Sequence, residues 1–238
     1  MQLLVWTPLI YGKRGFPEEE GKPYIPGKLL EESLRSSAIY YYIKKDKTIE
    51  NLVKRYLLKD RLAPSKIIED IEEIIYKKYP LLKEISFPEK IYLKKEEIYT
   101  EVVEVFDLET WEDVEEFRVP VYKGMVEFEG KCETGERLKA ISHSFCEALA
   151  KMEYSMLKGH PLAERFYQPL LNKIKTWEIP LRLGWWTETR FKGHLLFFWR
   201  IKEVRENLKK VLKEDIRPKR ILHLPKEKAT SGWCEIRL

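Results

Sequence analysis

In Pro23-Tyr-Ile-Pro-Gly-Lys-Leu-Leu-Glu-Glu-Ser-Leu-Arg35, two prolines and a glycine are followed at once by a helix-forming run. Pro23 and Pro26 fix φ and push the preceding residues toward extended geometry, and Gly27 gives a flexible turn. Apolar residues then recur at helical spacing, which predicts a helix over residues 28–44. The unpaired N–H groups of its first turn are a candidate anion site. An ordinary turn into a buried helix explains the same residues, so both interpretations stay open.

The composition is that of a protein with a substantial core. At 238 residues with 44% hydrophobic and 13% aromatic content, the chain is long enough for one large domain or two small ones. No run approaches the roughly 20 apolar residues that span a bilayer, and residues 1–6 are typical of a buried strand rather than of a signal peptide. We therefore expect a cytoplasmic protein without a membrane partner. Cys132, Cys146 and Cys234 lack Cys-x-x-Cys spacing, so neither a disulfide framework nor a zinc site is indicated.

Charge is unevenly distributed along the chain. Residues 66–116 carry 7 basic and 16 acidic side chains, net −9, whereas residues 173–238 carry 17 basic and 8 acidic, net +9. The basic part also contains Trp177, Trp185, Trp186, Trp199 and Trp233. Cations for phosphates and flat rings for bases are what a nucleic-acid-binding surface needs. A charge-rich surface over core tryptophans, as in many heat-adapted proteins, is the other interpretation.

The order of predicted elements indicates an α+β fold. Hydrophobic periodicity predicts a strand at 2–7, the helix at 28–44, a helical acidic insertion at 46–97 with N-caps at Thr48 and Ser65, strands at 98–106 and 117–128, a helix through 138–156, an extended segment at 177–184, a basic helix at 194–213, and strands at 217–222 and 232–238. Without the insertion, this order is ferredoxin-like (RRM-like): an antiparallel sheet with helices on one face and extra C-terminal β elements. The aromatic RNA-stacking signature of recognition-motif domains is absent from the sequence.

Histidines are the best candidates for acid–base chemistry. His143, His160, His194 and His223 form no metal-binding pair on one helix face, so no metal site is predicted. His194 and His223 lie near the basic segment, where they are candidates for general acid or base in metal-free RNA cleavage. The sequence contains no phosphate-binding P-loop, nucleophile elbow or paired-acid motif, and we predict no cofactor.

Three parts of the chain together resemble the CRISPR-associated RAMP superfamily. Thr7-Pro-Leu and Gly12, followed by Tyr24-Ile-Pro-Gly27 and Leu34-Arg35, are similar to its first strand, glycine turn and helix start. Leu181-Arg-Leu-Gly-Trp185 resembles its glycine-rich loop. Pro218-Lys-Arg220 and Gly232-Trp233 resemble its C-terminal segment. Within the superfamily, the resemblance is to the type III-A Csm-complex subunit that binds the 3′ end of the guide RNA.

The resemblance implies a single RAMP domain over residues 1–238. Its core would be 1–45 and 98–238, with the insertion at 46–97, and residues 173–238 are a candidate degenerate second half. The residues implied to contact RNA are Gly12, Lys13, Arg14, Gly27, Lys28, Arg35, Arg182, Gly184, Trp185, Trp186, Arg190, Lys192, Lys219 and Arg220.

The implied function is that of a non-catalytic guide-RNA-binding subunit of a type III CRISPR effector complex, an antiviral assembly. Its partners would be the guide (CRISPR) RNA and neighbouring effector subunits, with no small-molecule cofactor and no metal. Two alternatives stay open: a metal-independent CRISPR repeat-processing endoribonuclease that uses His194 or His223, and a protein-only scaffold whose interface is the acidic segment at 66–116.

Overall fold

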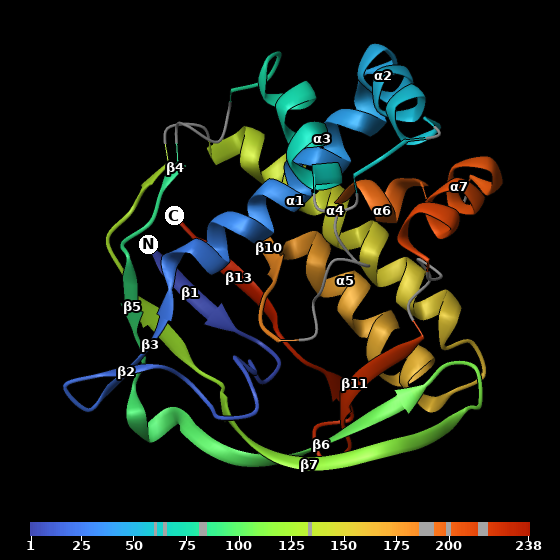
Figure 1. Cartoon of the computed structure of the whole chain (residues 1–238). Coiled ribbons are helices and arrows are strands. Elements are labelled where there is room, and N and C mark those ends of the chain that lie inside the picture. The colour runs from blue at the N-terminus through green and yellow to red at the C-terminus, as the bar shows by residue number, and fades with distance from the viewer. Residues whose placement is uncertain are drawn as a thin grey trace.

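The computed structural model of the chain describes residues 1–59, 61–63, 66–80, 85–132, 135–185, 193–198, 201–213 and 219–238 (Figure 1). Its strands are β1 (Gln2–Val5), β2 (Glu18–Glu19), β3 (Lys22–Pro26), β4 (Ile85–Ser86), β5 (Lys90–Tyr92), β6 (Ile98–Asp107), β7 (Glu112–Tyr122), β8 (Met125–Glu127), β9 (Lys131–Cys132), β10 (Ile179–Arg182), β11 (Arg220–Leu224), β12 (Ala229–Thr230) and β13 (Trp233–Arg237). Its helices are α1 (Gly27–Lys45), α2 (Lys47–Leu57), α3 (Ile67–Tyr76), the 3₁₀ turn η3 (Lys95–Glu97), α4 (Gly135–Met156), the π-helical turn η4 (Ala163–Tyr167), α5 (Gln168–Thr176), α6 (Gly193–Phe198) and α7 (Lys202–Leu212).

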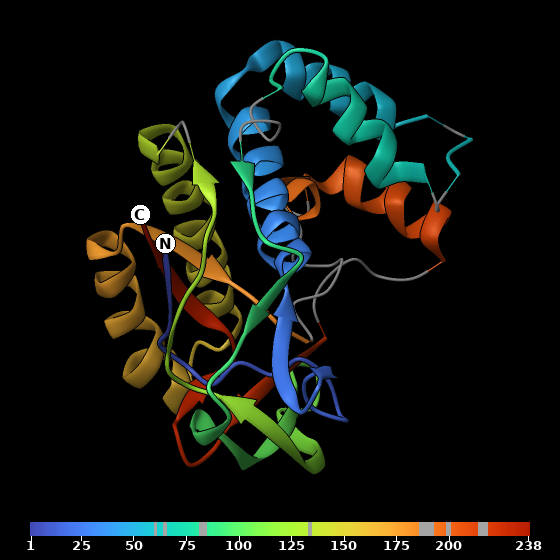
Figure 2. The ribbon, with the colours of Figure 1, turned by 90° about the vertical axis from the view of Figure 1, so that its left-hand side faces the viewer.

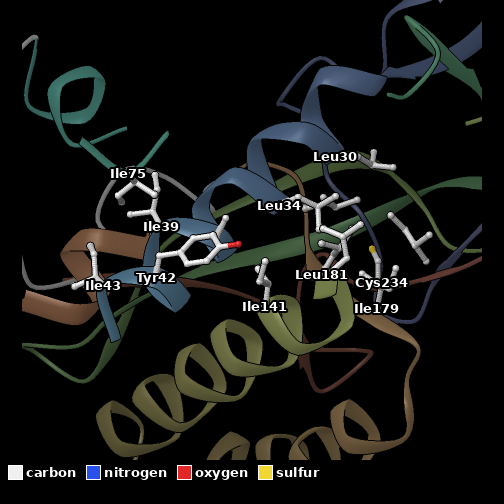
Figure 3. Close-up of a cluster of buried hydrophobic side chains, with 14 of the residues drawn as sticks. Leu30, Leu34, Ile39, Tyr42, Ile43, Ile75, Ile141, Ile179, Leu181 and Cys234 are labelled. Atoms are coloured by element: carbon white, nitrogen blue, oxygen red, sulfur yellow. The ribbon is translucent and has the colours of Figure 1, made fainter. Parts of the chain in front are cut away.

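The two ends of the chain form the centre of the first sheet. β1 lies between β8 and β13, and β10 pairs with the other edge of β13, with every pair antiparallel. The termini are therefore side by side (Figures 1 and 2). Leu30 and Leu34 of α1 and Ile141 of α4 share one buried cluster with Leu181 and Cys234 of the sheet (Figure 3). The two long helices thus cover one face of this sheet, as their apolar spacing predicts.

The second sheet is built on a long β6–β7 hairpin. β11 pairs with the other edge of β6, and β12 continues the sheet beyond β11. Figure 1 shows this hairpin curving along the bottom of the molecule, below the first sheet. Its inner face buries Val103, Val105, Val119 and Val121 against Ile10 of the N-terminal loop. The alternation of apolar residues in both strands explains why this face is dry.

The antiparallel sheet with helices on one face is confirmed. The ferredoxin-like arrangement stays a prediction, because the C-terminal strand β13 lies between β1 and β10. The predicted helix at 28–44 is α1 at Gly27–Lys45, and the predicted strand at 98–106 is β6 at Ile98–Asp107. Among the helices that the structure describes, none combines the length and the apolar character of a membrane span. The division into core and insertion stays a prediction.

The insertion is helical only in its first part. Ile67, Ile71 and Ile75 of α3 are buried, which confirms the predicted apolar stripe. The helical prediction is wrong for residues 85–86 and 90–92, which form β4 and β5; β5 finds a partner in the edge of β3. Asp46, rather than the predicted Thr48, caps α2 and accepts a hydrogen bond from the Thr48 N–H at 2.9 Å. The predicted cap at Ser65 lies outside the described residues.

Two further elements differ from the prediction. The helices η4 and α5, over 163–176, fall in a segment to which the sequence assigned no structure. The predicted basic helix at 194–213 is divided into α6 and α7, with residues 199 and 200 between them outside the description. α7 packs on the insertion, where Asn207 Nδ2 donates to the Leu57 carbonyl oxygen at 2.6 Å. Figure 2 shows α2, α3 and α7 together in one lobe beside the sheets.

Candidate functional site

One part of each of the three segments that carry the sequence resemblance lies at a common meeting point of the backbone. The Gly232 N–H donates to the Pro8 carbonyl oxygen at 3.1 Å, and the Leu183 N–H donates to the Gly232 carbonyl oxygen at 2.8 Å. The Trp185 N–H donates to the Ile10 carbonyl oxygen at 2.6 Å. We call this meeting of residues 7–10, 181–185 and 231–233 the loop junction. It connects the first strand, the glycine-rich loop and the last strand through their backbones.

Two glycines make the close approach of these backbones possible. Gly232 has φ +81°, and a Cβ atom there would lie 1.8 Å from the Leu183 carbonyl oxygen. Gly184 has φ +102°, and a Cβ atom there would lie 2.5 Å from the Ile10 carbonyl oxygen. Both positions need the left-handed region and space that only glycine leaves. The space beside Gly184 is therefore filled by the backbone of the same chain, at the Ile10 carbonyl oxygen.

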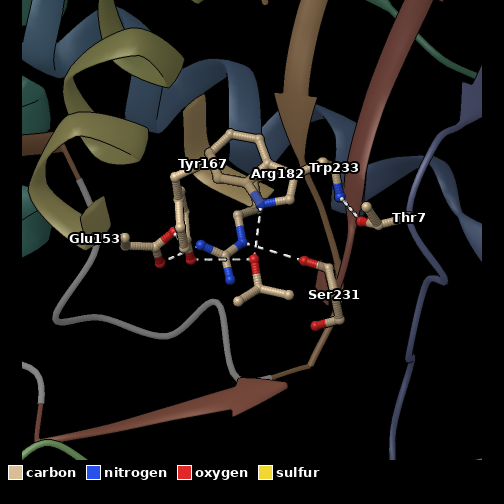
Figure 4. A network of polar contacts seen from close by, with 7 residues as sticks. Thr7, Glu153, Tyr167, Arg182, Ser231 and Trp233 are labelled. Atoms are coloured by element: carbon tan, nitrogen blue, oxygen red, sulfur yellow. Dashed lines mark hydrogen bonds and ion pairs between the residues drawn. The ribbon is translucent and has the colours of Figure 1, made fainter. Parts of the chain in front are cut away.

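Behind the loop junction lies a buried polar network (Figure 4). Arg182 Nη1 forms an ion pair with Glu153 Oε1, and Arg182 Nε donates to the Ser231 carbonyl oxygen at 3.2 Å. The Tyr167 hydroxyl donates to Glu153 Oε2 at 3.0 Å and lies 3.2 Å from Thr230 Oγ1. The side chains of Arg182 and Glu153 are only 7% and 0% exposed. A charge this deep is tolerated because its partner and the surrounding hydrogen bonds replace water.

Burial and pairing shift the pKa values in this network. Burial acts to lower the pKa of Arg182, but the Glu153 carboxylate, Tyr167 and Cys146 together outweigh it, so that the pKa is raised. Burial raises the pKa of Tyr167 well above its ordinary value, and the Glu153 carboxylate adds to the rise. At neutral pH the arginine is thus charged and the tyrosine neutral, which makes the network a fixed structural unit.

Arg182 was predicted to contact a phosphate, whereas the structure places it in a buried ion pair. Its guanidinium points into the interior and lies 4.9 Å from the centre of the Trp233 ring. Sequence reasoning missed the partner, Glu153, which lies on α4 four residues after the buried Leu149. A carboxylate at a core position of an apolar helix stripe is the signal that could have found it.

The exposed side of the loop junction carries an aromatic and cationic surface. The rings of Phe117 and Trp185 have centroids 5.6 Å apart. Lys13 Nζ lies 4.9 Å from the Phe117 centroid and 5.9 Å from that of Trp185, and also pairs with Glu115 Oε1 at 2.8 Å. Arg14 is the next exposed residue of the same turn. We call Lys13, Arg14, Phe117 and Trp185 the Lys13–Trp185 surface.

A tight turn holds Lys13 and Arg14 in place. The Gly15 N–H donates to the Gly12 carbonyl oxygen at 3.0 Å, and Gly15 has φ +88°. A Cβ atom at Gly15 would lie 2.9 Å from Pro120 Cγ of β7. The turn is therefore fitted against the hairpin strand that also carries Phe117. The structure thus brings Gly12, Lys13 and Arg14 together with Gly184 and Trp185.

A second group of predicted residues lies elsewhere, at the start of α1. Lys28 and Arg35 line a surface pocket of about 690 Å³ between α1, α3 and residues 87–89. The same pocket is lined by the acidic residues Glu31, Glu32, Glu69, Glu72 and Glu89. The Gly27 N–H donates to the Glu89 carbonyl oxygen at 3.0 Å, and a Cβ atom at Gly27 would lie 2.0 Å from the Pro88 oxygen. The chain itself closes this helix start, and the acidic lining disfavours a phosphate.

A third group lies near the tip of the β6–β7 hairpin. Lys219 Nζ is 3.4 Å from Glu109 Oε1, and Arg220 Nε is 3.3 Å from Asp107 Oδ2. Arg220 pairs with Asp107 of β6. Phe117 pairs with Val103, four residues earlier on β6, so the two groups are about 13 Å apart along the strands. Trp186, Arg190 and Lys192 lie outside the described residues, as do Trp199 and Pro218 and the side chain of His194.

Comparisons with known proteins identify both a relative and a fold. No family model matches the chain. An uncharacterized protein of Aquifex aeolicus (strain VF5) is 39% identical over 239 residues, covering 100% of this chain and 99% of that protein.

Solved structures of Csm subunits share the fold. A crystal structure of T. onnurineus Csm5 matches 95% of this chain and 77% of its own at 14% identity, with a TM-score of 0.61. A chain in the cryo-EM structure of a Csm-crRNA-target RNA ternary complex of a type III-A CRISPR-Cas system matches 98% of this chain and 79% of its own at 14% identity, with a TM-score of 0.59. The predicted resemblance to Csm subunits is therefore confirmed at the level of the fold. The chain belongs to the same protein family as the Aquifex aeolicus relative, and its fold is that of the Csm5 subunit.

Proposed function

We propose that this protein is an RNA-contacting subunit of a type III CRISPR effector complex that binds the 3′ part of the guide RNA and docks on neighbouring subunits. The observation that carries the proposal is the Lys13–Trp185 surface on a Csm5-like fold. Aromatic rings next to cations suit single-stranded RNA, because bases stack on rings while phosphates pair with the cations.

The acidic neighbour of Lys13 is a small obstacle to phosphate binding. The Lys13–Glu115 pair is exposed, with side-chain exposures of 56% and 42%. Exposed pairs of this kind contribute about 0.2–1 kcal/mol, so a phosphate can replace Glu115 at little cost. Trp185 is half-buried and held by its backbone hydrogen bond to Ile10, which limits the entropy lost on stacking.

RNA binding by the full-length protein tests the surface directly. We expect a fluorescein-labelled single-stranded RNA to bind with strong salt dependence in fluorescence anisotropy. Trp185→Ala should weaken binding by about 1–3 kcal/mol if it stacks on one base. Lys13→Ala should reduce the slope of log affinity against log salt by about 0.7. Lys139→Ala, an exposed cation on α4, is the matched control and should bind like the wild type.

Three outcomes would contradict the proposal. Unchanged affinity in both Lys13→Ala and Trp185→Ala would remove the surface from the RNA interface. Partner subunits that copurify after nuclease treatment, without any RNA affinity, would favour the scaffold. Cleavage of repeat RNA that persists in a chelator and is lost in His223→Ala would favour the endoribonuclease. For the position in the complex, RNA crosslinked to tagged protein in its host should map to the 3′ part of guide RNAs.

A further inference from the structure

A separate polar cluster lies on the other face of the β6–β7–β11 sheet. Glu104 of β6, Asp113 of β7 and His223 of β11 each offer one metal-ligating atom, and these three atoms lie within 4.8 Å of one another. Phe117 pairs with Val103, the residue next to Glu104, and successive residues of a strand face opposite sides. The cluster is therefore on the face opposite to the Lys13–Trp185 surface, and it plays no part in the function proposed above.

A β-bulge places Asp113 in this cluster. The pairing of β6 with β7 shifts by one residue between Val105 and Phe106, so that Val114 is extra and Asp113 pairs with Phe106. Phe106 shares the face of Glu104, because the two residues are two positions apart. In a regular pairing, Val114 would occupy the position that Asp113 takes. Bulges commonly re-aim a side chain in this way next to functional sites.

His223 directs an unused nitrogen lone pair at Asp113. Its Nε2 lies 3.0 Å from Glu104 Oε2, so that a proton on Nε2 faces this carboxylate. With its proton on Nε2, the neutral ring has a lone pair on Nδ1, which is buried and has no hydrogen-bond partner among the described residues. Asp113 Oδ1 lies 3.7 Å from this nitrogen, and His223 is only 8% exposed. Two acceptors thus face each other across a gap that is too long for a hydrogen bond.

We propose that His223 Nδ1 and Asp113 Oδ1 bind a divalent transition-metal ion of the Zn²⁺ class, with water completing its coordination. Two ligands at about 2.1 Å from one ion in tetrahedral geometry are about 3.4 Å apart, close to the separation found here. Glu104 is the positioning residue, because ligating histidines usually donate their other N–H to a carboxylate. Asp113 is half-exposed, which gives the ion a path from solvent.

His160 lies next to the proposed site but is not one of its ligands. Its ring centroid is 6.2 Å from that of His223 and 4.7 Å from that of Phe106. Its Nδ1 accepts a hydrogen bond from the Leu162 N–H at 3.2 Å, so its own proton is on Nε2. A nitrogen and a carboxylate oxygen favour Zn²⁺ over Mg²⁺, which prefers oxygen ligands alone. The three residues of the cluster are on three strands, so no sequence spacing reveals them.

Calorimetric titration of Zn²⁺ into the untagged, chelator-treated full-length protein tests the site. We expect one Zn²⁺ per chain in the wild type, and at least tenfold weaker binding in Asp113→Asn and in His223→Gln. Glu112→Gln is the matched control, because it removes a carboxylate one residue away on the same strand, and it should bind like the wild type. Mg²⁺ should bind at least tenfold more weakly than Zn²⁺.

Equal Zn²⁺ affinity in the wild type and Asp113→Asn would overturn the proposal, as would a wild type that binds no Zn²⁺. Mg²⁺ binding as tight as that of Zn²⁺ would overturn the assignment of the nitrogen ligand. If His223→Gln fails to fold by circular dichroism, Asp113→Asn decides the question alone, because the Asp113 side chain is 51% exposed.

Discussion

Gly232 touches Leu183 through its backbone, since a Cβ atom at Gly232 would lie 1.8 Å from the Leu183 carbonyl oxygen. This contact joins the last strand to the glycine-rich loop and lies beside the hydrogen bond from Gly232 to Pro8. This contact between two residues 49 positions apart therefore fixes the position of the loop that carries Trp185. It also makes Gly232 the position at which a single methyl group should do the most damage to the loop junction.

We expect Gly232→Ala to lower the free energy of unfolding by at least about 3 kcal/mol, from left-handed backbone strain and the clash together. Gly21→Ala is the matched control, because Gly21 has φ +74° but open space around its Cα, so only the strain of about 1–2 kcal/mol applies. Urea unfolding of the three proteins measures both losses. Equal losses in the two variants would contradict the close approach at Gly232.

Breaking the buried Glu153–Arg182 pair should be costly. Glu153→Ala leaves the Arg182 guanidinium buried without its partner, so we expect a loss of about 3–5 kcal/mol in the free energy of unfolding. Glu147→Ala removes an exposed partner of Lys151 from the same helix and should cost less than about 0.5 kcal/mol. The double variant Glu153→Leu with Arg182→Met should be more stable than Glu153→Ala, because no unpaired charge remains. Thermal and urea unfolding decide between these outcomes.

The elements that were predicted correctly are those whose apolar periodicity can be recognised within one short stretch of sequence. The helix at 28–44 and the strand at 98–106 agree with α1 and β6 within one residue at each end, because apolar periodicity is a property of neighbouring residues. The strand β5 was missed because its partner, β3, lies more than 60 residues earlier, and short strands depend on such a partner.

The site was predicted less well than the fold, because its geometry depends on distant pairs. Lys13 and Trp185 were predicted from the sequence, but their shared contact with Phe117 of β7 was not. Arg182 was predicted to contact RNA because its buried partner Glu153, 29 residues earlier on α4, is not adjacent in the sequence. The bulge that turns Asp113 toward His223 likewise depends on pairing across strands.

Asp46 should make the stability of the insertion depend on acid pH. Hydrogen bonds from Lys78 and Tyr79 lower the pKa of the Asp46 carboxyl below its usual range. A lowered pKa means that Asp46 stabilises the fold above its unfolded pKa of about 3.9, and that this contribution is lost as the pH falls further. Asp46→Ala should therefore be less stable than the wild type at pH 7, and the difference should shrink below about pH 4.

Urea unfolding at pH 7, 5 and 3 checks this dependence on Asp46. Glu73→Ala is the control, because among the described residues Glu73 forms a salt bridge with the exposed Lys77 one turn away, and its removal should have little effect at any of these pH values. A wild-type advantage over Asp46→Ala that grows toward pH 3 would contradict the role assigned to the carboxylate.

The buried thiols of Cys146 and Cys234 should be unreactive in the folded protein. Both residues are 0% exposed, and burial raises the pKa of the Cys146 thiol to about 12 and also raises that of Cys234. The thiolate is the reactive form, so its concentration at pH 8 is negligible in either residue. In a Cys132→Ser background, which leaves these two thiols alone, we expect a colorimetric disulfide reagent to label neither until urea unfolds the protein. Labelling at the rate of a free thiol without urea would show that the α4–β10 contact, where Cys146 donates to the Pro180 carbonyl oxygen at 3.3 Å, opens in the native state.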